Sequence, residues 1–336
     1  MGKIKTDFEK SSDQGFEAAA RNSQAPCATS TPKKLVLAVS GGIDSMVMLD
    51  VLLRSRLVKS EDLIVAHFDH GARDSSRMDA HFVEHVAIRQ KLDFRTMRAE
   101  LGEDVAEDFA REQRYNFLQQ ISQASGNATI CTAHHLDDLT ESVAINLLRG
   151  TGWRGLAVLD RPGSWRPFLD TAFCQIFNDL LPGEPVSTLP ISKNKIRQYA
   201  AQYSVVFRQD QSNNSEKYLR NRVRKQLDQV ESDAKLKIFR LWQQQKLIKQ
   251  ELGELLQEVV PAPGEIWQRE WFSHLDDWVA VELLRAGTQQ CGIKATRPQL
   301  SNFLKAIRTY NPGKCFNLPG DILVKFSKTD FSLTVL

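Results

Sequence analysis

The sequence predicts an α/β fold in which a parallel sheet with helices on both faces is followed by a smaller, mainly helical domain. Between residues 35 and 150, short runs of strand length alternate with segments of helical length, which is the pattern of βαβ units. Polar and glycine-containing motifs follow several of these runs, at the strand ends where such sheets bind ligands. After residue 226, apolar residues recur at helical spacing instead.

The composition is that of an ordinary globular protein. The chain has 336 residues, of which 42% are hydrophobic and 25% charged, and its length suggests two domains. Residues 1–34 are rich in Ser, Ala, Gln and Thr without an apolar period, so we expect a disordered tail there. No apolar stretch is long enough to span a bilayer, and we expect no membrane partner. Five scattered cysteines without a Cys-x-x-Cys pair favour a reducing, cytoplasmic location.

The first domain, residues 35–225, is expected to begin with alternating strands and helices. Four short runs are expected to form the strands of the parallel sheet, at 35–39, 63–68, 93–97 and 128–133. The segments that follow them have helical length, and the expected helices are 44–53, 79–90, 105–122 and 137–148. Residues 165–195 contain several prolines and are expected to be irregular.

The second domain, residues 226–336, is expected to begin with a long helix. Its apolar side chains recur at helical spacing, and they are Ile238, Leu241, Trp242, Ile248, Leu252, Leu255, Leu256 and Val259. The segment Pro261-Ala262-Pro263-Gly264 breaks this pattern. From Cys315 onward, we expect short strands joined by turns.

A phosphate-binding loop is predicted between the first strand and the first helix, at Ser40-Gly41-Gly42-Ile43-Asp44-Ser45. Its glycines let the backbone approach an anion, and the N–H groups at a helix start form a phosphate site. The hydroxyls of Ser40 and Ser45 can donate further hydrogen bonds. Asp44 is unusual beside an anion unless a cation lies between them, so we expect it to bind Mg²⁺. The alternative interpretation is an ordinary Gly-Gly turn capped by Ser and Asp.

Carboxylates are predicted to lie near this loop. On a helix, His134, Asp138 and Glu141 would share one face, which suits a bound cation or the ammonium group of lysine. His135 and Asp137 are expected to point elsewhere. The alternative interpretation is a helix start decorated with acidic residues, which the helix dipole favours in any case.

Two groups of basic residues can bind phosphates. Arg111 and Arg114 lie three residues apart on one helix face, where an arginine pair can clamp a phosphate. The densest basic cluster consists of Lys217, Arg220, Arg222, Arg224 and Lys225, with Tyr218 inside it. Such a cluster can neutralise RNA phosphates while the tyrosine stacks on a base. For both groups the alternative is an ordinary solvated basic face.

The sequence Ser-Gly-Gly-x-Asp-Ser after the first strand is the signature of the PP-loop ATP pyrophosphatases, which this chain therefore resembles. The resemblance implies that the protein binds ATP and splits it between the α and β phosphates. It further implies that an oxygen is activated as its adenylate, which an amine or sulfur nucleophile then displaces.

Within that superfamily the chain resembles the tRNA(Ile)-lysidine synthetases, strongly over residues 35 to about 227 and loosely beyond. The matching stretches are, in chain order, His67-Phe68-Asp69-His70-Gly71-Ala72-Arg73, Ala110-Arg111-Glu112-Gln113-Arg114-Tyr115, Ala133-His134-His135-Leu136-Asp137-Asp138-Leu139-Thr140-Glu141, Arg149-Gly150-Thr151-Gly152, Asp210-Gln211-Ser212-Asn213 and Tyr218-Leu219-Arg220-Asn221-Arg222-Val223-Arg224. Ala72 and Ser142 replace the usual Leu and Thr. An apparent insertion of about twenty residues follows 166–169, judged by loop lengths. The chain resembles the short form, which lacks a last C-terminal domain.

The resemblance implies a reaction in two steps. The O2 carbonyl of the wobble cytidine, in isoleucine tRNA with a CAU anticodon, attacks the α phosphorus of ATP, and pyrophosphate leaves. The ε-amine of L-lysine then displaces AMP at C2 and forms lysidine. The amine has an ordinary pKa near 10.4 and must lose a proton, which either Asp138 or His134 could accept. A homodimer is compatible with this resemblance.

Roles for individual residues follow from the same resemblance. The implied catalytic residues are Asp44, Arg111, Arg114, His134 and Asp138. Those implied to contact lysine or tRNA are Asp138, Glu141, Tyr218, Arg220, Arg222 and Arg224. Residues 40–45 are implied to hold ATP, with Asp44 on Mg²⁺.

Three other functions remain open on the sequence. A tRNA thiolase of the same superfamily would need paired or catalytic cysteines, and the chain has no Cys-x-x-Cys pair. A small-molecule AMP-forming synthetase would not need the basic cluster. A non-catalytic RNA-binding module would not need Asp44.

Overall fold

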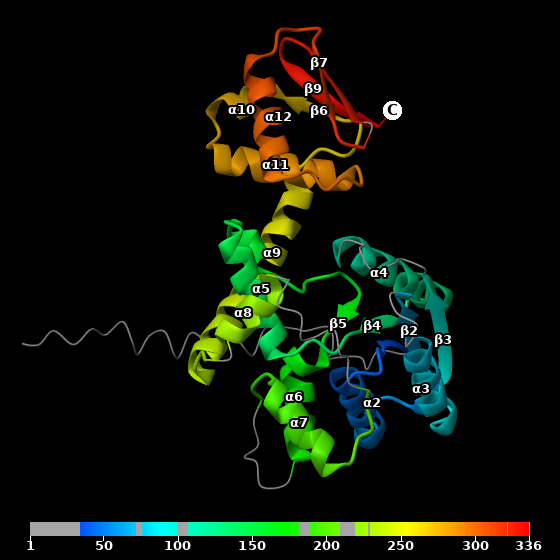
Figure 1. Ribbon diagram of the computed structural model, residues 1–336. Coiled ribbons are helices and arrows are strands. Elements are labelled where there is room, and N and C mark those ends of the chain that lie inside the picture. The colour runs from blue at the N-terminus through cyan, green and yellow to red at the C-terminus, as the bar shows by residue number, and fades with distance from the viewer. Residues whose placement is uncertain are drawn as a thin grey trace, which may run out of the picture. The chain divides into compact units, whose positions relative to one another are not determined.

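The computed structural model describes residues 34–71, 76–99, 107–181, 188–208, 219–227, 229–320 and 322–335. The expected tail, residues 1–34, falls outside this part of the chain except for Lys34. The chain divides into two compact units, the first ending at Lys246 and the second beginning at Leu247. The first contains a parallel sheet flanked by helices, and the second is mainly helical with a small antiparallel sheet. The predicted fold class is thus confirmed (Figure 1).

Five strands form the sheet of the first unit, in the order β3-β2-β1-β4-β5, and all neighbours are parallel. The strands are β1 (Leu35–Ala38), β2 (Leu63–Asp69), β3 (Asp93–Arg98), β4 (Thr129–Cys131) and β5 (Ser164–Trp165). The chain builds outward from β1 to β3 and then returns to the other side of β1 with β4. The carboxyl ends of β1 and β4 therefore flank the point where the strand order reverses, which is where such sheets bind ligands.

Helices cover both faces of this sheet, as Figure 1 shows. They are α2 (Ile43–Ser55), α3 (Ser76–Arg89), α4 (Glu107–Ala124), α6 (Thr171–Asp179) and α7 (Lys193–Gln202). Leu35 and Leu37 belong to the core shared with α2, α3, α6 and α7, whereas Val36 and Ile64 pack with Tyr115 of α4. Side chains that alternate between two buried faces are typical of a parallel strand covered on both sides.

Three more helices lie beyond the sheet, namely α5 (Leu136–Leu148), α8 (Leu219–Leu227) and α9 (Ser232–Val259). Leu139 and Val143 of α5 share a core with Phe239 and Trp242 of α9. The first part of α9 therefore belongs to the first unit. The boundary accordingly lies inside α9, further along the chain than the expected position near residue 226.

The segment 165–195 is more regular than expected. It contains α6, which is capped by Asp170, whose carboxylate accepts a hydrogen bond from the backbone N–H of Phe173 at 3.1 Å. Phe173 and Phe177 are buried in the main core. The expectation of an irregular segment is wrong here because the prolines fall outside this short helix, Pro167 opening the 3₁₀ turn η3 (Pro167–Leu169) before it. Two more 3₁₀ turns, η1 (Ser60–Asp62) and η2 (Trp153–Leu156), also belong to this unit.

The second unit packs helices against an antiparallel sheet. Its elements after α9 are β6 (Ile266–Gln268), α10 (Arg269–His274), α11 (Asp277–Gln290), α12 (Arg297–Thr309), β7 (Cys315–Leu318), β8 (Ile322–Phe326) and β9 (Asp330–Val335). The strand order is β6-β9-β8-β7. Trp267, Phe272, Phe303 and Phe331 form the centre of its core. No helix in the described part of the chain is both long and apolar enough to cross a membrane.

Candidate active site

The predicted phosphate loop joins the carboxyl end of β1 to α2. The hydroxyl of Ser45 donates to the carbonyl of Gly42 at 3.0 Å and accepts from the N–H of Ser40 at 3.1 Å. Gly41 has φ of 87°, and a Cβ there would lie 3.3 Å from Cγ2 of Val83 on α3. These contacts hold the loop in one shape, with the first-turn N–H groups of α2 at the end of the strand, where an anion would be bound.

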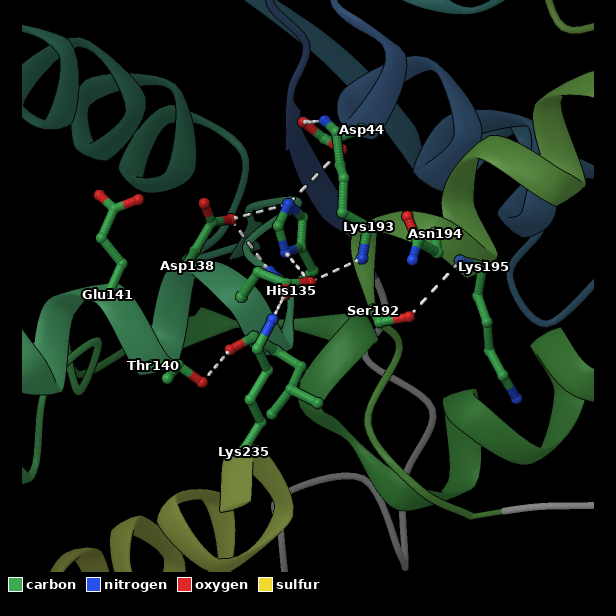
Figure 2. Close-up of polar contacts among 12 residues, drawn as sticks. Asp44, His135, Asp138, Thr140, Glu141, Ser192, Lys193, Asn194, Lys195 and Lys235 are labelled. Atoms are coloured by element: carbon green, nitrogen blue, oxygen red, sulfur yellow. Dashed lines mark hydrogen bonds and ion pairs between the residues drawn. The ribbon is translucent and has the colours of Figure 1, made fainter. Parts of the chain in front are cut away.

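Asp44, in the first turn of α2, is bound by a lysine that the sequence analysis missed. Nζ of Lys193 lies 2.5 Å and 2.7 Å from the two carboxylate oxygens of Asp44 (Figure 2). The backbone N–H of Lys193 donates to Oδ2 of Asp137 at 2.8 Å. A positively charged lysine at the first position of α7 is repelled by the positive end of the helix dipole. The nearby carboxylates are therefore needed to stabilise its charge there. Ser192 caps α7 and marks where the helix begins, but no local pattern in the sequence connects the lysine after it with Asp44.

His134 lies outside the helix on which it was expected. α5 begins at Leu136 with His135 as its N-cap, whose backbone is extended at φ −118° and ψ −178°. Nδ1 of His134 instead lies 2.9 Å from Oγ1 of Thr132. The predicted helical face is therefore wrong for His134. Asp138 and Glu141 do project from the same side of α5, as Figure 2 shows.

His135 lies between two carboxylates, although it was expected to point elsewhere. Nε2 of its buried ring is 3.7 Å from Oδ1 of Asp44 and 3.4 Å from Oδ2 of Asp138. Asp138 also accepts a hydrogen bond from the backbone N–H of His135 at 3.2 Å. The expectation failed because an N-cap residue does not follow the rotation of the helix it precedes. Oδ2 of Asp137 lies 3.6 Å from Nδ1 of His135, and Nζ of Lys235 on α9 lies 2.6 Å from its Oδ1.

Glu141 is buried and forms an ion pair with α8. Its side chain is 4% exposed, and Oε2 accepts a hydrogen bond from Nε of Arg224 at 2.9 Å. Burial lowers the pKa of Arg224, but Glu141, followed by Asp138 and Asp44, raises it above the ordinary value. Arg224 therefore faces the carboxylates of the site.

Arg111 and Arg114 of α4 lie near His134 and contact Tyr115. Both guanidinium carbons are 5.6 Å from the centroid of the Tyr115 ring. Burial, followed by Arg166, Arg111 and Arg114, holds the pKa of His134 well below its ordinary value. The imidazole is therefore neutral at neutral pH. The structure thus brings Arg111, Arg114 and His134 together, while Asp138 faces Asp44.

The remaining predicted residues lie on or before α8. Arg222 is exposed on this helix. Tyr218 lies outside the described residues, and the described part of α8 does not include the side chain of Arg220. Of the predicted basic cluster, the described side chains are those of Arg222 and Lys225, which are exposed, and Arg224, which binds Glu141.

The protein's own residues offer only part of a metal site. Among the described residues, no group of three or more His, Cys, Asp or Glu side chains is arranged to hold a metal ion. Mg²⁺ is commonly bound by one or two carboxylates together with substrate phosphates and water. Asp44 fits this arrangement, because it lies at the phosphate loop and its two oxygens already accommodate a cation, the ammonium group of Lys193.

Several known proteins are similar to this chain over two thirds of its length or more. A tRNA(Ile)-lysidine synthase from Thermotoga maritima is 32% identical over 241 residues, which is 67% of this chain and 53% of that protein. The Enterococcus faecalis protein of the same name is 30% identical over 249 residues, covering 70% of this chain and 50% of its own. The one from Actinobacillus pleuropneumoniae is 30% identical over 287 residues, with coverages of 83% and 63%. The chain spans about half the length of the first two relatives.

Similarity to solved structures is lower. A U34-tRNA thiolase from Methanococcus maripaludis is similar over 70% of this chain and 79% of its own. Its TM-score of 0.49 and identity of 15% are too low to bear on function. The model of the PP-loop domain matches residues 14–231. This match covers more than half of the chain and includes the loop at the end of β1, so the chain belongs to the PP-loop family.

Proposed function

We propose that the protein joins L-lysine to C2 of the wobble cytidine of isoleucine tRNA with a CAU anticodon, forming lysidine, AMP and pyrophosphate. The observation that carries this proposal is the carboxylate of Asp138 beside His135 and Asp44, at a phosphate loop. A carboxylate next to a nucleotide site suits a cationic second substrate. The relatives named tRNA(Ile)-lysidine synthase support the same reaction.

ATP is proposed to bind with its phosphates on residues 40–45. Asp44 would hold Mg²⁺ together with phosphate oxygens, and the ion would neutralise charge on the departing pyrophosphate. With Asp44 engaged by the metal, the ammonium group of Lys193 is available to bind a phosphate. Arg111 and Arg114 are proposed to act on the same polyphosphate as charged hydrogen-bond donors.

The chemistry proceeds through an adenylated base. The O2 atom of cytidine attacks the α phosphorus, and the bond between the α and β phosphates breaks. The ε-nitrogen of lysine then attacks C2, the bond from C2 to the activated oxygen breaks, and AMP leaves. We assign acceptance of the amine proton to Asp138, because burial and the neighbouring arginines, which lower the pKa of His134, disfavour a protonated imidazole there.

Lysine recognition is assigned to the side of α5 that faces the loop. Asp138 is proposed to bind an ammonium group of lysine, and Glu141 to share in this through its pair with Arg224. Together Glu141 and Arg224 present both signs of charge, which suits a free amino acid with its ammonium and carboxylate groups.

Contacts with tRNA are assigned to Arg222, and to Arg220 and Tyr218, which precede it closely in the sequence. Exposed arginines neutralise RNA phosphates without reading sequence. A cytoplasmic location and a homodimer remain predictions.

Three of the four described cysteines, all except the exposed Cys315, favour an amine nucleophile over sulfur chemistry. Cys131 and Cys174 are buried, and burial raises the pKa of the Cys174 thiol far above its ordinary value. Burial also raises the pKa of Cys291. A thiolate is the reactive form of cysteine, so these thiols are poorly suited to carry sulfur.

The proposed function is tested by incubating the protein with ATP, Mg²⁺, labelled lysine and total tRNA. We expect label to enter tRNA only when ATP is present, with one AMP released for each lysine incorporated. AMP release without tRNA would instead indicate a small-molecule synthetase, and tRNA-dependent AMP release that requires a sulfur donor would indicate a thiolase.

A further inference from the structure

A buried arginine that has no role in the function proposed above lies near Arg111 and His134. Arg166 directly follows β5 and is only 8% exposed. Its Nε and Nη2 atoms are buried and find no hydrogen-bond partner in the described part of the chain. A guanidinium group has only donors, so these atoms require acceptors. Burying them without acceptors is strongly unfavourable.

Charges of both signs lie around Arg166. Burial contributes most and lowers the pKa of its guanidinium, Tyr115 and Asp160 raise it, and Arg111 lowers it. The guanidinium carbon of Arg161 lies 3.9 Å from the centroid of the Tyr115 ring, and that of Arg111 lies 5.6 Å from it. With Arg114, whose guanidinium carbon is also 5.6 Å from the centroid, three arginines gather around this buried ring.

The hydroxyl of Tyr115 lies beside Arg166 and is also buried. Tyr115 is 1% exposed, and its hydroxyl makes no hydrogen bond of good geometry among the described residues, although it is close enough to Arg166 to raise the pKa of that guanidinium through a hydrogen bond. Buried polar groups in folded proteins are almost always paired. Because a tyrosine hydroxyl that accepts from an arginine can still donate its own proton, this hydroxyl and the guanidinium together form a set of donors suited to the oxygens of an anion.

The position of this donor set connects it with the phosphate loop. Arg166 follows β5 and His134 follows β4, at the same carboxyl edge of the sheet as the loop after β1. Arg166 also lies close enough to His134 to lower the pKa of its imidazole. The donor set and the loop therefore face the same ligand-binding edge.

We propose that Arg166, together with Arg111 and the Tyr115 hydroxyl, binds a phosphate group of the pyrophosphate portion of ATP. This inference rests on the proposed use of the site for ATP. The depth of Arg166 favours a compact terminal phosphate, because the backbone of a folded RNA binds at protein surfaces. Arg166 is thus a binding residue for the leaving group.

This role has an energetic consequence that a purely structural role would not have. A buried charge without a pair can often be replaced by an apolar residue of similar size without loss of stability. Arg166→Met should therefore leave the melting temperature of the ligand-free protein unchanged or raise it. If Arg166 instead served to hold the fold together, the same substitution would lower that temperature.

The test measures the affinity for inorganic pyrophosphate in the presence of Mg²⁺ by titration calorimetry. We expect Arg166→Met to weaken binding about 10- to 100-fold, the loss of one or two charge-assisted hydrogen bonds, and Arg166→Lys to weaken it less. The matched control is Arg297→Met on α12, an exposed arginine whose guanidinium lies 5.0 Å from the ring centroid of Trp278. This control should bind pyrophosphate like the wild type.

Pyrophosphate affinity within about twofold of wild type in folded Arg166→Met would overturn the proposal. If that variant does not fold, unchanged affinity in Arg166→Lys would do the same. The proposal would also be overturned if an Arg166 variant bound pyrophosphate normally but bound tRNA more weakly. That result would assign the site to an RNA phosphate. Loss of pyrophosphate binding in a protein that never forms lysidine would keep the subsite and reject the proposed function.

Discussion

At the scale of single residues, the carboxylate of Asp44 is the group on which the site depends. Its two oxygens are bound by the ammonium group of Lys193, which is 149 residues further along the chain. Both side chains are about one-third exposed, at 32% and 28%, so the pair contributes little to stability and can exchange partners. Asp44 could be predicted from its local motif. Lys193 could not, because only the fold brings it to the loop.

Asp44→Asn should abolish AMP formation while leaving the fold intact. The amide keeps the size of the side chain but is a poor ligand for Mg²⁺. The free energy of unfolding should change by less than about 1 kcal/mol, since the ion pair with Lys193 is partly exposed. AMP release and urea denaturation measure the two effects. Asp179→Asn, an exposed change at the end of α6, is the control, and near-normal turnover in Asp44→Asn would reject the metal role.

His134 predicts a dependence of stability on pH. Burial and the nearby arginines keep its folded-state pKa well below the ordinary value of 6.5. Between these two values the unfolded chain binds more protons than the folded one, so the free energy of unfolding rises with pH there. The protein should therefore lose stability as the pH falls below about 6.5, and His134→Gln should lose less. Part of the dependence should persist, because burial also lowers the pKa of His67 and His70.

The measurement is the urea midpoint of both proteins at several pH values between about 5 and 7. His134→Gln should show the smaller change of midpoint across this range. Equal pH dependence in the two proteins would mean that His134 titrates normally and does not lie among uncompensated positive charges.

At the scale of elements, the start of α5 decides which side chains meet. The helix itself could be predicted from its length and position after β4. The direction of its N-cap side chain could not be deduced from the rotation per residue of a helix. His135 has an extended backbone instead and turns its ring toward Asp44. The pairing of α5 with α8 through Glu141 and Arg224 was missed for a similar reason. A regular spacing of basic residues does not show which of them faces another helix.

Asp138→Asn and Glu141→Gln should separate binding from stability on this face of α5. Both should raise the KM for lysine by about tenfold or more, because each removes a charge-assisted interaction, and both should spare the KM for ATP. Only Glu141→Gln should also lower the free energy of unfolding, by about 1–3 kcal/mol, because it breaks the hydrogen-bonded pair of a buried carboxylate.

Steady-state kinetics with each substrate varied in turn, and urea denaturation, measure these effects. A double-mutant cycle of Glu141→Gln with Arg224→Met gives the coupling of the pair. If both single variants keep the wild-type KM for lysine and the wild-type rate, lysine is recognised elsewhere. A rise in the KM for ATP in Asp138→Asn would place that carboxylate on the metal instead.

At the scale of the whole molecule, the sheet order brings the motifs together. The alternation of strands and helices was enough to predict a parallel sheet with its ligands at the carboxyl edge. It was not enough to place the unit boundary, because the apolar period of α9 runs without interruption past Lys246. The short helix α6 was also missed, since its nine residues lie in a proline-containing stretch and give a weak periodic signal.

Binding of tRNA should depend on Arg222. Removing one phosphate contact should weaken binding and reduce the slope of log K against log salt by about 0.7 to 0.9. Arg222→Ala is compared with Arg89→Ala, an exposed arginine at the end of α3, by filter binding at several salt concentrations. An unchanged slope in Arg222→Ala would mean that this arginine is only a solvated surface residue.

Attachment of lysine to the wobble cytidine is detected by mass spectrometry of that nucleoside. Isoleucine tRNA with a CAU anticodon is incubated with the protein, ATP, Mg²⁺ and lysine, then digested to nucleosides. We expect a cytidine heavier by the mass of lysine less one water, formed by the wild type and not by Asp44→Asn. An unmodified wobble cytidine, or one in which sulfur has replaced oxygen, would rule out lysidine formation by this protein.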